Sequence, residues 1–122
     1  MQDFDKALEQ FIEGCQKTFD ESHPAVLAAM VEVKLVIRNR NAKYIAIDRV
    51  ETNKESKKVV TASVHCFVAA KDGHTKGLGS FKQGDVLKAA GFKAPAKGAR
   101  GNIFDEHKGL GRMGRFGPGY NN

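Results

Sequence analysis

Residues 31–38 read VEVKLVIR, a run in which apolar and charged side chains alternate. One face of this run is apolar and the other is charged: Val31, Val33, Leu35 and Ile37 against Glu32, Lys34 and Arg38. An alternation with a period of two residues predicts a β-strand that buries one face. The stretch therefore predicts a sheet with a core on one side, and the rest of the chain is interpreted outward from it.

Two further strand-like runs follow, at residues 43–51 and 59–69. A turn at 39–41 separates the first two runs, because asparagine tolerates left-handed backbone geometry, and a polar loop at 52–58 separates the last two. Such short connections predict antiparallel neighbours. Strict alternation in the third run predicts two faces: Val60, Ala62, Val64, Cys66 and Val68 on one, and Val59, Thr61, Ser63, His65 and Phe67 on the other. His65 and Cys66 would then face opposite ways and could not form a nucleophile–base pair.

The chain before the sheet predicts an amphipathic helix over residues 3–20, on which the apolar side chains recur at helical spacing. Its apolar stripe consists of Phe4, Leu8, Phe11, Ile12, Cys15 and Phe19. Pro24 marks its end, because the residue before a proline leaves the helical region. Residues 25–30 fit either one more helical turn or an extended connector.

The chain after the third run is rich in glycine. Residues 70–84 form a long connection with a hairpin signal at Asp72-Gly73, and residues 85–90 fit a short strand or one turn of helix. The last 15 residues hold little to pack, so we expect them to be flexible unless a ligand or a partner subunit orders them.

These elements predict one α+β domain over residues 1–122, in which an N-terminal helix packs on an antiparallel sheet of about four strands. Residues 1–30 form the helical part, residues 31–90 the sheet, and residues 91–122 an irregular, basic, glycine-rich arm.

The net charge of +6 arises entirely in the second half of the chain. Residues 1–70 hold ten Lys and Arg against ten Asp and Glu, whereas residues 71–122 hold ten against four. This asymmetry favours an anionic partner, such as a nucleic acid, a phosphorylated small molecule or a membrane surface. A solvated basic tail is the alternative.

Other residue patterns limit the class of function. Cys15 and Cys66 lie in apolar patterns without metal-ligand spacing, which predicts buried free thiols in a reducing compartment. The histidines have no ligand spacing, and no acid–base pair can be identified, so we expect a binding protein with no metal and no cofactor and not an enzyme. No apolar run reaches the roughly 18 residues of a membrane span, and the acidic N-terminus does not resemble a signal peptide.

The segment Gly84 to Phe104, GDVLKAAGFKAPAKGARGNIF, is the candidate site. Its stretch from Lys97 to Asn102 resembles a phosphate cradle, because glycines let backbone N–H groups approach an anion while Lys97 and Arg100 add charged donors. It lacks the ending of a P-loop. An ordinary basic loop is equally consistent with the pattern.

Further side chains in or near this segment suit a nucleotide. Phe92, next to Lys93, can stack on a base or seal the arm onto the sheet. Asn102 can contact a base edge or cap a turn. Arg112 and Arg115 alternate with glycines, as in basic nucleic-acid-binding tails and in disordered termini.

Three runs carry a resemblance to a known family: Ser63–Val68 (SVHCFV), Gly84–Ala90 (GDVLKAA) and Lys93–Asn102 (KAPAKGARGN). Over residues 43–105 the chain resembles small phage proteins, the best understood of which are the Thoeris anti-defence sponge proteins of the first type. The resemblance implies a protein that sequesters cyclic ADP-ribose isomers made by bacterial TIR-domain defence proteins, in the cytoplasm of the infected host, without degrading them. Similar proteins bind cyclic di- and trinucleotides, and the family forms dimers and, in some members, hexamers of dimers.

The resemblance also implies ligand contacts. The family's base-stacking aromatic falls on Phe92, its asparagine on Asn102, and its phosphate-binding C-terminal arginine on Arg112 or Arg115. Lys93, Lys97 and Arg100 complete the expected basic site.

The sequence departs from the family pattern in three places. Gly91-Phe92 replaces a common Ser-Trp, Gly101 stands where some members have an aromatic, and residues 74–83 lengthen the hairpin tip. A single-stranded nucleic-acid-binding protein is the alternative function, and a structural phage protein is a third.

Overall fold

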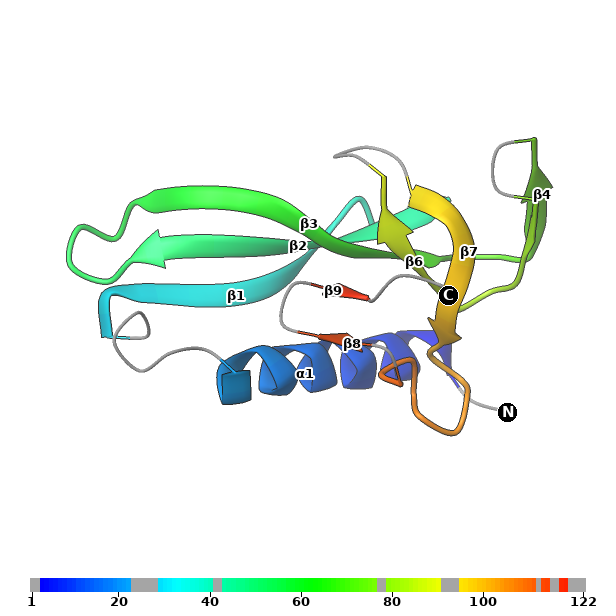
Figure 1. Cartoon of the computed structure of the whole chain (residues 1–122), viewed down its shortest axis with the longest axis horizontal. Coiled ribbons are helices and arrows are strands. Elements are labelled where there is room, and N and C mark those ends of the chain that lie inside the picture. The colour runs from blue at the N-terminus through cyan, green and yellow to red at the C-terminus, as the bar shows by residue number, and fades with distance from the viewer. Residues whose placement is uncertain are drawn as a thin grey trace.

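The computed structural model describes residues 3–22, 29–40, 43–76, 79–90, 95–111, 113–114 and 117–118. One helix, α1 (Phe4–Ser22), packs on one face of a five-stranded antiparallel sheet, as Figure 1 shows. The predicted α+β architecture is therefore confirmed. No helix in the described ranges is both long enough and apolar enough to span a bilayer.

The sheet has the strand order β1-β2-β3-β6-β7, so β1 and β7 form its outer edges. Its strands are β1 (Val31–Arg38), β2 (Tyr44–Asn53), β3 (Val59–Ala69), β6 (Asp85–Ala89) and β7 (Pro95–Asn102). Two small hairpins complete the described elements: β4 (Gly73–Thr75) with β5 (Gly79–Phe81), and β8 (Met113–Gly114) with β9 (Gly117–Pro118).

The alternation predicted for residues 59–69 is wrong in the middle of β3, because a β-bulge interrupts it. Ile47 pairs with Cys66, but the next residue of β2, Asp48, pairs with Val64, so His65 is the extra residue. Cys66 consequently packs in the core beneath the sheet, while Val64 packs on the opposite face with Phe67. The prediction that His65 and Cys66 face opposite ways rested on this alternation, so the strand pattern no longer supports that prediction.

The main core lies between α1 and the sheet. Its fully buried side chains include Leu8 and Phe11 from the helix and Ile45, Ile47 and Val68 from the strands. The apolar residues that alternate along the strands face the apolar residues that recur every 3.6 positions along the helix, and together they form this layer. A smaller cluster of Ala46, Phe67 and Leu87 lies on the other face.

Two segments are more regular than the sequence predicted. Residues 95–102, expected within an irregular arm, form the edge strand β7, and residues 85–89 form a strand and not a helical turn. The predicted hairpin at 70–84 is present as β4–β5, but Gly73 begins β4 instead of forming the tip.

Part of the C-terminal segment packs on the helix, contrary to the expectation that it holds little to pack. Leu110 and Met113 contact the main core. A Cβ atom on Gly14 would lie 2.3 Å from Leu110 Cδ1, so this glycine allows the close approach. Gly109 also depends on being glycine, since its φ is +81° and an added Cβ would lie 2.9 Å from the Phe11 ring.

Candidate functional site

The edge strand β7 is strongly bulged. Its pairs with β6 are Asp85 with Asn102, Leu87 with Ala99 and Ala89 with Pro95. Between successive pairs β7 therefore contains more residues than β6, which is the mark of a bulge. Gly98 (φ +94°) and Gly101 (φ +149°) occupy backbone regions that other residues rarely adopt. Bulges of this kind redirect side chains and are frequent beside binding sites.

Arg100 lies between these two glycines and is only 8% exposed. Its Nη1 donates a hydrogen bond to the carbonyl oxygen of Gly98, which holds the guanidinium against its own strand. The side chain lines an open hollow of about 460 Å³, together with Ala99, Gly101, Asp105, His107 and Gly111. Arg100, predicted from the sequence as a ligand-binding residue, thus lines a hollow, and its role in binding stays a prediction.

Asp105 is the acidic group of the same hollow, and backbone N–H groups surround its carboxylate. Oδ2 accepts from Asn102 at 3.0 Å, and Oδ1 accepts from His107 at 2.9 Å and from Gly109 at 3.0 Å. Partial desolvation acts to raise the pKa of Asp105, but these hydrogen bonds and the charge of His107 outweigh it and lower the pKa below its ordinary value. The donors offset part of the negative charge that would oppose an anion.

The Asn102 side chain joins two segments, the turn at residues 83–85 and its own turn at residues 102–104. Its Nδ2 donates to the Gln83 carbonyl at 2.9 Å and to Asp85 Oδ1 at 3.0 Å, while its Oδ1 accepts from Phe104 N–H at 2.8 Å. These contacts match the turn-capping alternative considered for this residue. Both amide protons have protein partners, so contact with a base edge, which stays a prediction, would exchange at least one of these bonds or use the second lone pair of Oδ1.

The remaining predicted site residues are described only in part. Phe92, Lys93, Arg112 and Arg115 lie outside the described residues. Lys97 belongs to β7, but its side chain is outside the description. Of the seven predicted residues, Arg100 and Asn102 are thus the two with described side chains. They lie on β7 two residues apart, and Arg100 alone lines the hollow.

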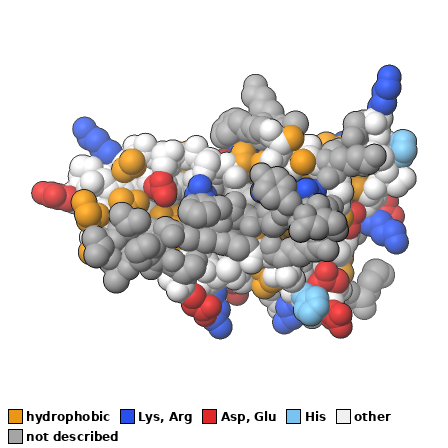
Figure 2. Space-filling view, viewed as in Figure 1, with side chains coloured by type: hydrophobic (Ala, Val, Ile, Leu, Met, Phe, Trp, Pro, Cys, Tyr) orange, Lys and Arg blue, Asp and Glu red, His pale blue; other side chains and the backbone are white. Residues whose placement is uncertain are grey.

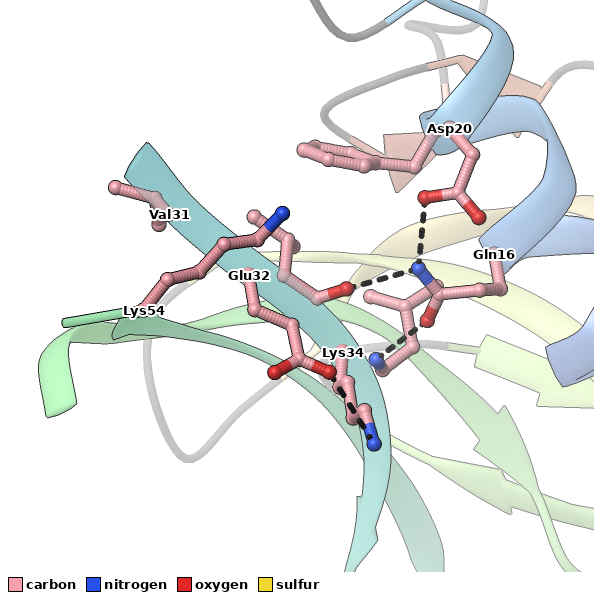
Figure 3. Close-up of a pocket in the computed structure, with 9 residues that line it drawn as sticks. Gln16, Asp20, Val31, Glu32, Lys34 and Lys54 are labelled. Atoms are coloured by element: carbon pink, nitrogen blue, oxygen red, sulfur yellow. Dashed lines mark hydrogen bonds and ion pairs between the residues drawn. The ribbon is translucent and has the colours of Figure 1, made fainter. Parts of the chain in front are cut away.

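A second hollow, of about 380 Å³, lies between the C-terminal half of α1 and β1, as Figure 3 shows. Gln16 and Asp20 extend from the helix toward the strand. The Gln16 amide donates to the Val33 carbonyl at 2.9 Å and accepts from Leu35 N–H at 3.0 Å. Residue patterns alone gave no sign of Gln16, because a glutamine on a helix surface is ordinary.

Buried polar groups lie elsewhere in the sheet. His65 is 2% exposed, and neither ring nitrogen has a hydrogen-bond partner among the described residues. The predicted free cysteines, Cys15 and Cys66, are confirmed as unpaired and buried. In the ranges given above, no three His, Cys, Asp or Glu side chains cluster as metal ligands would.

The exposed surface shows an apolar region far from β7. In Figure 2 hydrophobic side chains gather at the left end of the molecule, where β1 and β3 begin and β2 ends in Figure 1. Met30, Val59 and Val60 are each about 60% exposed there (59%, 62% and 60%). Lys54, Lys57 and Lys58 lie in the adjoining turn, so the region contains both apolar and positively charged side chains.

Comparison with known proteins gives a family but no activity. The model of a family of unknown function (DUF7717) matches residues 2–115. No curated protein and no solved structure is similar enough to count as a match.

Proposed function

Because the chain belongs to a family of unknown function, DUF7717, we propose a function from its own geometry: it binds and sequesters cyclic nucleotide signals without degrading them. The resemblance to phage Thoeris anti-defence sponges suggests the ligand, a cyclic ADP-ribose isomer or a cyclic di- or trinucleotide. The place of action would then be the cytoplasm of an infected bacterium.

The bulged edge strand β7 is the observation that supports this proposal most directly. It combines two positive-φ glycines with Arg100 beside an open hollow of about 460 Å³. That volume falls within the roughly 300–1,000 Å³ of small-molecule sites. Glycine backbone permits close approach to an anion, and an arginine fork matches phosphate geometry.

The charges near β7 support an anionic ligand. The strand itself carries Lys97 and Arg100, and Lys93 precedes it by two residues. Among the described residues, Asp105 is the carboxylate that lines the hollow, and it accepts three backbone hydrogen bonds. In this proposal Phe92 stacks on a base, and Arg112 or Arg115 adds a phosphate contact.

The proposal includes a homodimer, or a hexamer built from dimers, as the resemblance implies. It includes no chemical step, no metal and no cofactor. Capture without turnover needs only a preorganised site, because preorganisation lowers the entropic cost of binding.

A thermal-shift panel of cyclic ADP-ribose isomers and cyclic di- and trinucleotides tests the proposal. A ligand that binds only the folded protein stabilises it by RT ln(1 + [L]/Kd), so the melting temperature rises with the logarithm of the ligand concentration above Kd. After heat denaturation, mass spectrometry should recover the ligand intact. The proposal fails if no ligand in the panel shifts the melt, or if the ligand is recovered hydrolysed.

The variants Phe92→Ala and Lys97→Ala should each weaken binding. Lys57→Ala is the matched control, because Lys57 is an exposed lysine in the turn between β2 and β3. Asn102→Ala is a poor test, since the loss of its contacts to Gln83, Asp85 and Phe104 would disturb the fold as well.

Salt dependence distinguishes the nucleic-acid alternative. Binding that weakens steeply with salt and needs several nucleotides would indicate a single-stranded nucleic-acid-binding protein. A ligand the size of one cyclic nucleotide, with weak salt dependence, would exclude it.

A further inference from the structure

The outer edge of β1 offers backbone hydrogen-bonding groups beside the helix. The Gln16 contacts identify them: the Val33 carbonyl and Leu35 N–H bond to a helix side chain, so they point away from β2 and toward the hollow between α1 and β1. In an antiparallel strand these directions alternate, so the odd-numbered residues of β1 present their polar backbone groups outward. The hollow runs along the part of the edge where an added strand would lie.

Gln16 makes the contacts that a neighbouring strand would make. Its side-chain amide donates to the carbonyl of one residue of β1 and accepts from the N–H of the residue two positions further. An antiparallel partner makes the same two bonds with the N–H of one residue and the carbonyl of the residue two positions before it. A strand added here would therefore exchange these two hydrogen bonds for equivalent ones. The edge is occupied by a side chain whose two hydrogen bonds to β1 a partner strand can replace.

We propose that a second copy of this chain pairs with β1 in antiparallel fashion, about a two-fold axis through Val33, so that two five-stranded sheets become one continuous sheet. In this register Val33 faces Val33 of the second copy. The carbonyl of Val33 then accepts from that residue's N–H, and Leu35 N–H donates to Val31 of the second copy. Both bonds that Gln16 makes are replaced.

The charges of β1 favour this register. Glu32 lies opposite Lys34 of the second copy, and the two-fold axis repeats the pair. Both side chains are well exposed, at 50% and 69%, and lie close enough on their own strand to form a 3.4 Å ion pair. Their polar backbone groups point toward β2, so across the new interface they form a non-hydrogen-bonded pair, in which opposite side chains are closest.

The exposed apolar side chains of β1 and Met30 favour the same register as the charges do. Val36 is 42% exposed on the same face of β1 as Glu32 and Lys34. Extending the register by one residue beyond the strand brings Met30, 59% exposed, toward Val36 of the second copy. Association would thus cover two large apolar side chains of each subunit that the described residues leave in solvent.

The interface is independent of the proposed ligand site. β1 and β7 are opposite edges of the sheet, so strand addition at β1 leaves the hollow beside Arg100 open. A chain that is a monomer would contradict this interface and the homodimer of the proposed function. Ligand binding at β7 would still have its own test, because mass and ligand binding are measured separately.

Charge reversal tests the register by light scattering after size exclusion. We expect the native chain to elute as a dimer. Glu32→Lys alone, or Lys34→Glu alone, creates two like-charge pairs per interface and should weaken association roughly tenfold or more. An equimolar mixture of the two variants should form heterodimers, and the double variant Glu32→Lys/Lys34→Glu should dimerise as the native chain does. Lys57→Glu, in an exposed turn, is the control and should leave the mass unchanged.

Gln16→Ala gives a second, independent measurement. Removal of the group that occupies the edge should tighten association several-fold, without any change at the charged pair. The proposal is wrong if the native chain is a monomer at every concentration tested. It is also wrong if the single charge reversals dimerise as tightly as the native chain, or if their mixture fails to recover the dimer.

Discussion

At the scale of single residues, His65 links the bulge in β3 to the stability of the protein. Burial, and then the positive charge of Arg49, lower the pKa of His65 from 6.5 to about 4. No described residue offers either ring nitrogen a hydrogen bond, so the folded protein holds the ring neutral. The unfolded chain has an ordinary histidine and binds a proton at a higher pH.

Stability should therefore fall in mild acid. Between about pH 6.5 and about pH 4 the unfolded state binds more protons than the folded state, so the free energy of unfolding decreases as the pH falls. A shift of this size corresponds to a loss of about 3 kcal/mol by pH 4. Urea denaturation of the native chain and of His65→Leu across this range should show a flatter profile for the variant. Replacing the exposed His107 by glutamine is the control, and an equally steep profile for His65→Leu would contradict the assignment.

At the scale of elements, the contact between α1 and the loop after β7 depends on one glycine. An interior helix position favours alanine over glycine by about 1 kcal/mol. At Gly14, however, an added Cβ would lie 2.3 Å from Leu110 Cδ1, which is closer than the two atoms can approach. Packing against the loop should outweigh helix propensity.

We therefore expect Gly14→Ala to destabilise the native chain but to stabilise the Leu110→Ala variant. A double-mutant cycle by urea denaturation measures this change of sign. If Gly14→Ala stabilises both backgrounds, Leu110 does not pack on the helix as described.

A comparison of the strands shows which of them the sequence patterns could predict and which they could not. The boundaries of β1 and β3 agree with those predicted, since alternating β-branched residues favour strands. Strand β7 was missed because its sequence, PAKGARGN, lacks an apolar period and contains glycine and proline, which are depleted in strands. Its place is determined by pairing with β6 and by the contacts of Asn102, which are tertiary.

At the scale of the whole molecule, the two cysteines report on the integrity of the core. Cys15 comes from α1 and Cys66 from β3, and both are fully buried in the layer between helix and sheet. Burial raises the pKa of Cys15 to about 12. Burial and, secondarily, the neighbouring Cys15 raise the pKa of Cys66 well above its ordinary value. Neither thiol forms a reactive thiolate while the layer is closed.

Neither cysteine should react with a thiol reagent in the native protein near neutral pH, and both should react in denaturant. The labelling rate should follow global unfolding, because the helix must leave the sheet to expose either side chain. Glu55→Cys, in the exposed turn after β2, should react at once and serves as the control. Rapid labelling of Cys15 or Cys66 without denaturant would indicate that α1 opens locally.

The amino-acid sequence by itself determined the local elements: the α1 stripe, the strands β1 to β3, the turns between them and the basic second half. Periodicity and turn residues encode these features within a few positions of the chain. Only the tertiary structure decided the bulge at His65, the strand β7, the role of Asn102 in joining residues 83–85 to residues 102–104, and the Gln16 contacts on the edge of β1. Each of these features depends on contacts between residues that are distant in the sequence, and no local sequence pattern encodes such contacts. For Arg100 both sources were needed: its charge was evident from the sequence, whereas its position beside the hollow depends on the fold.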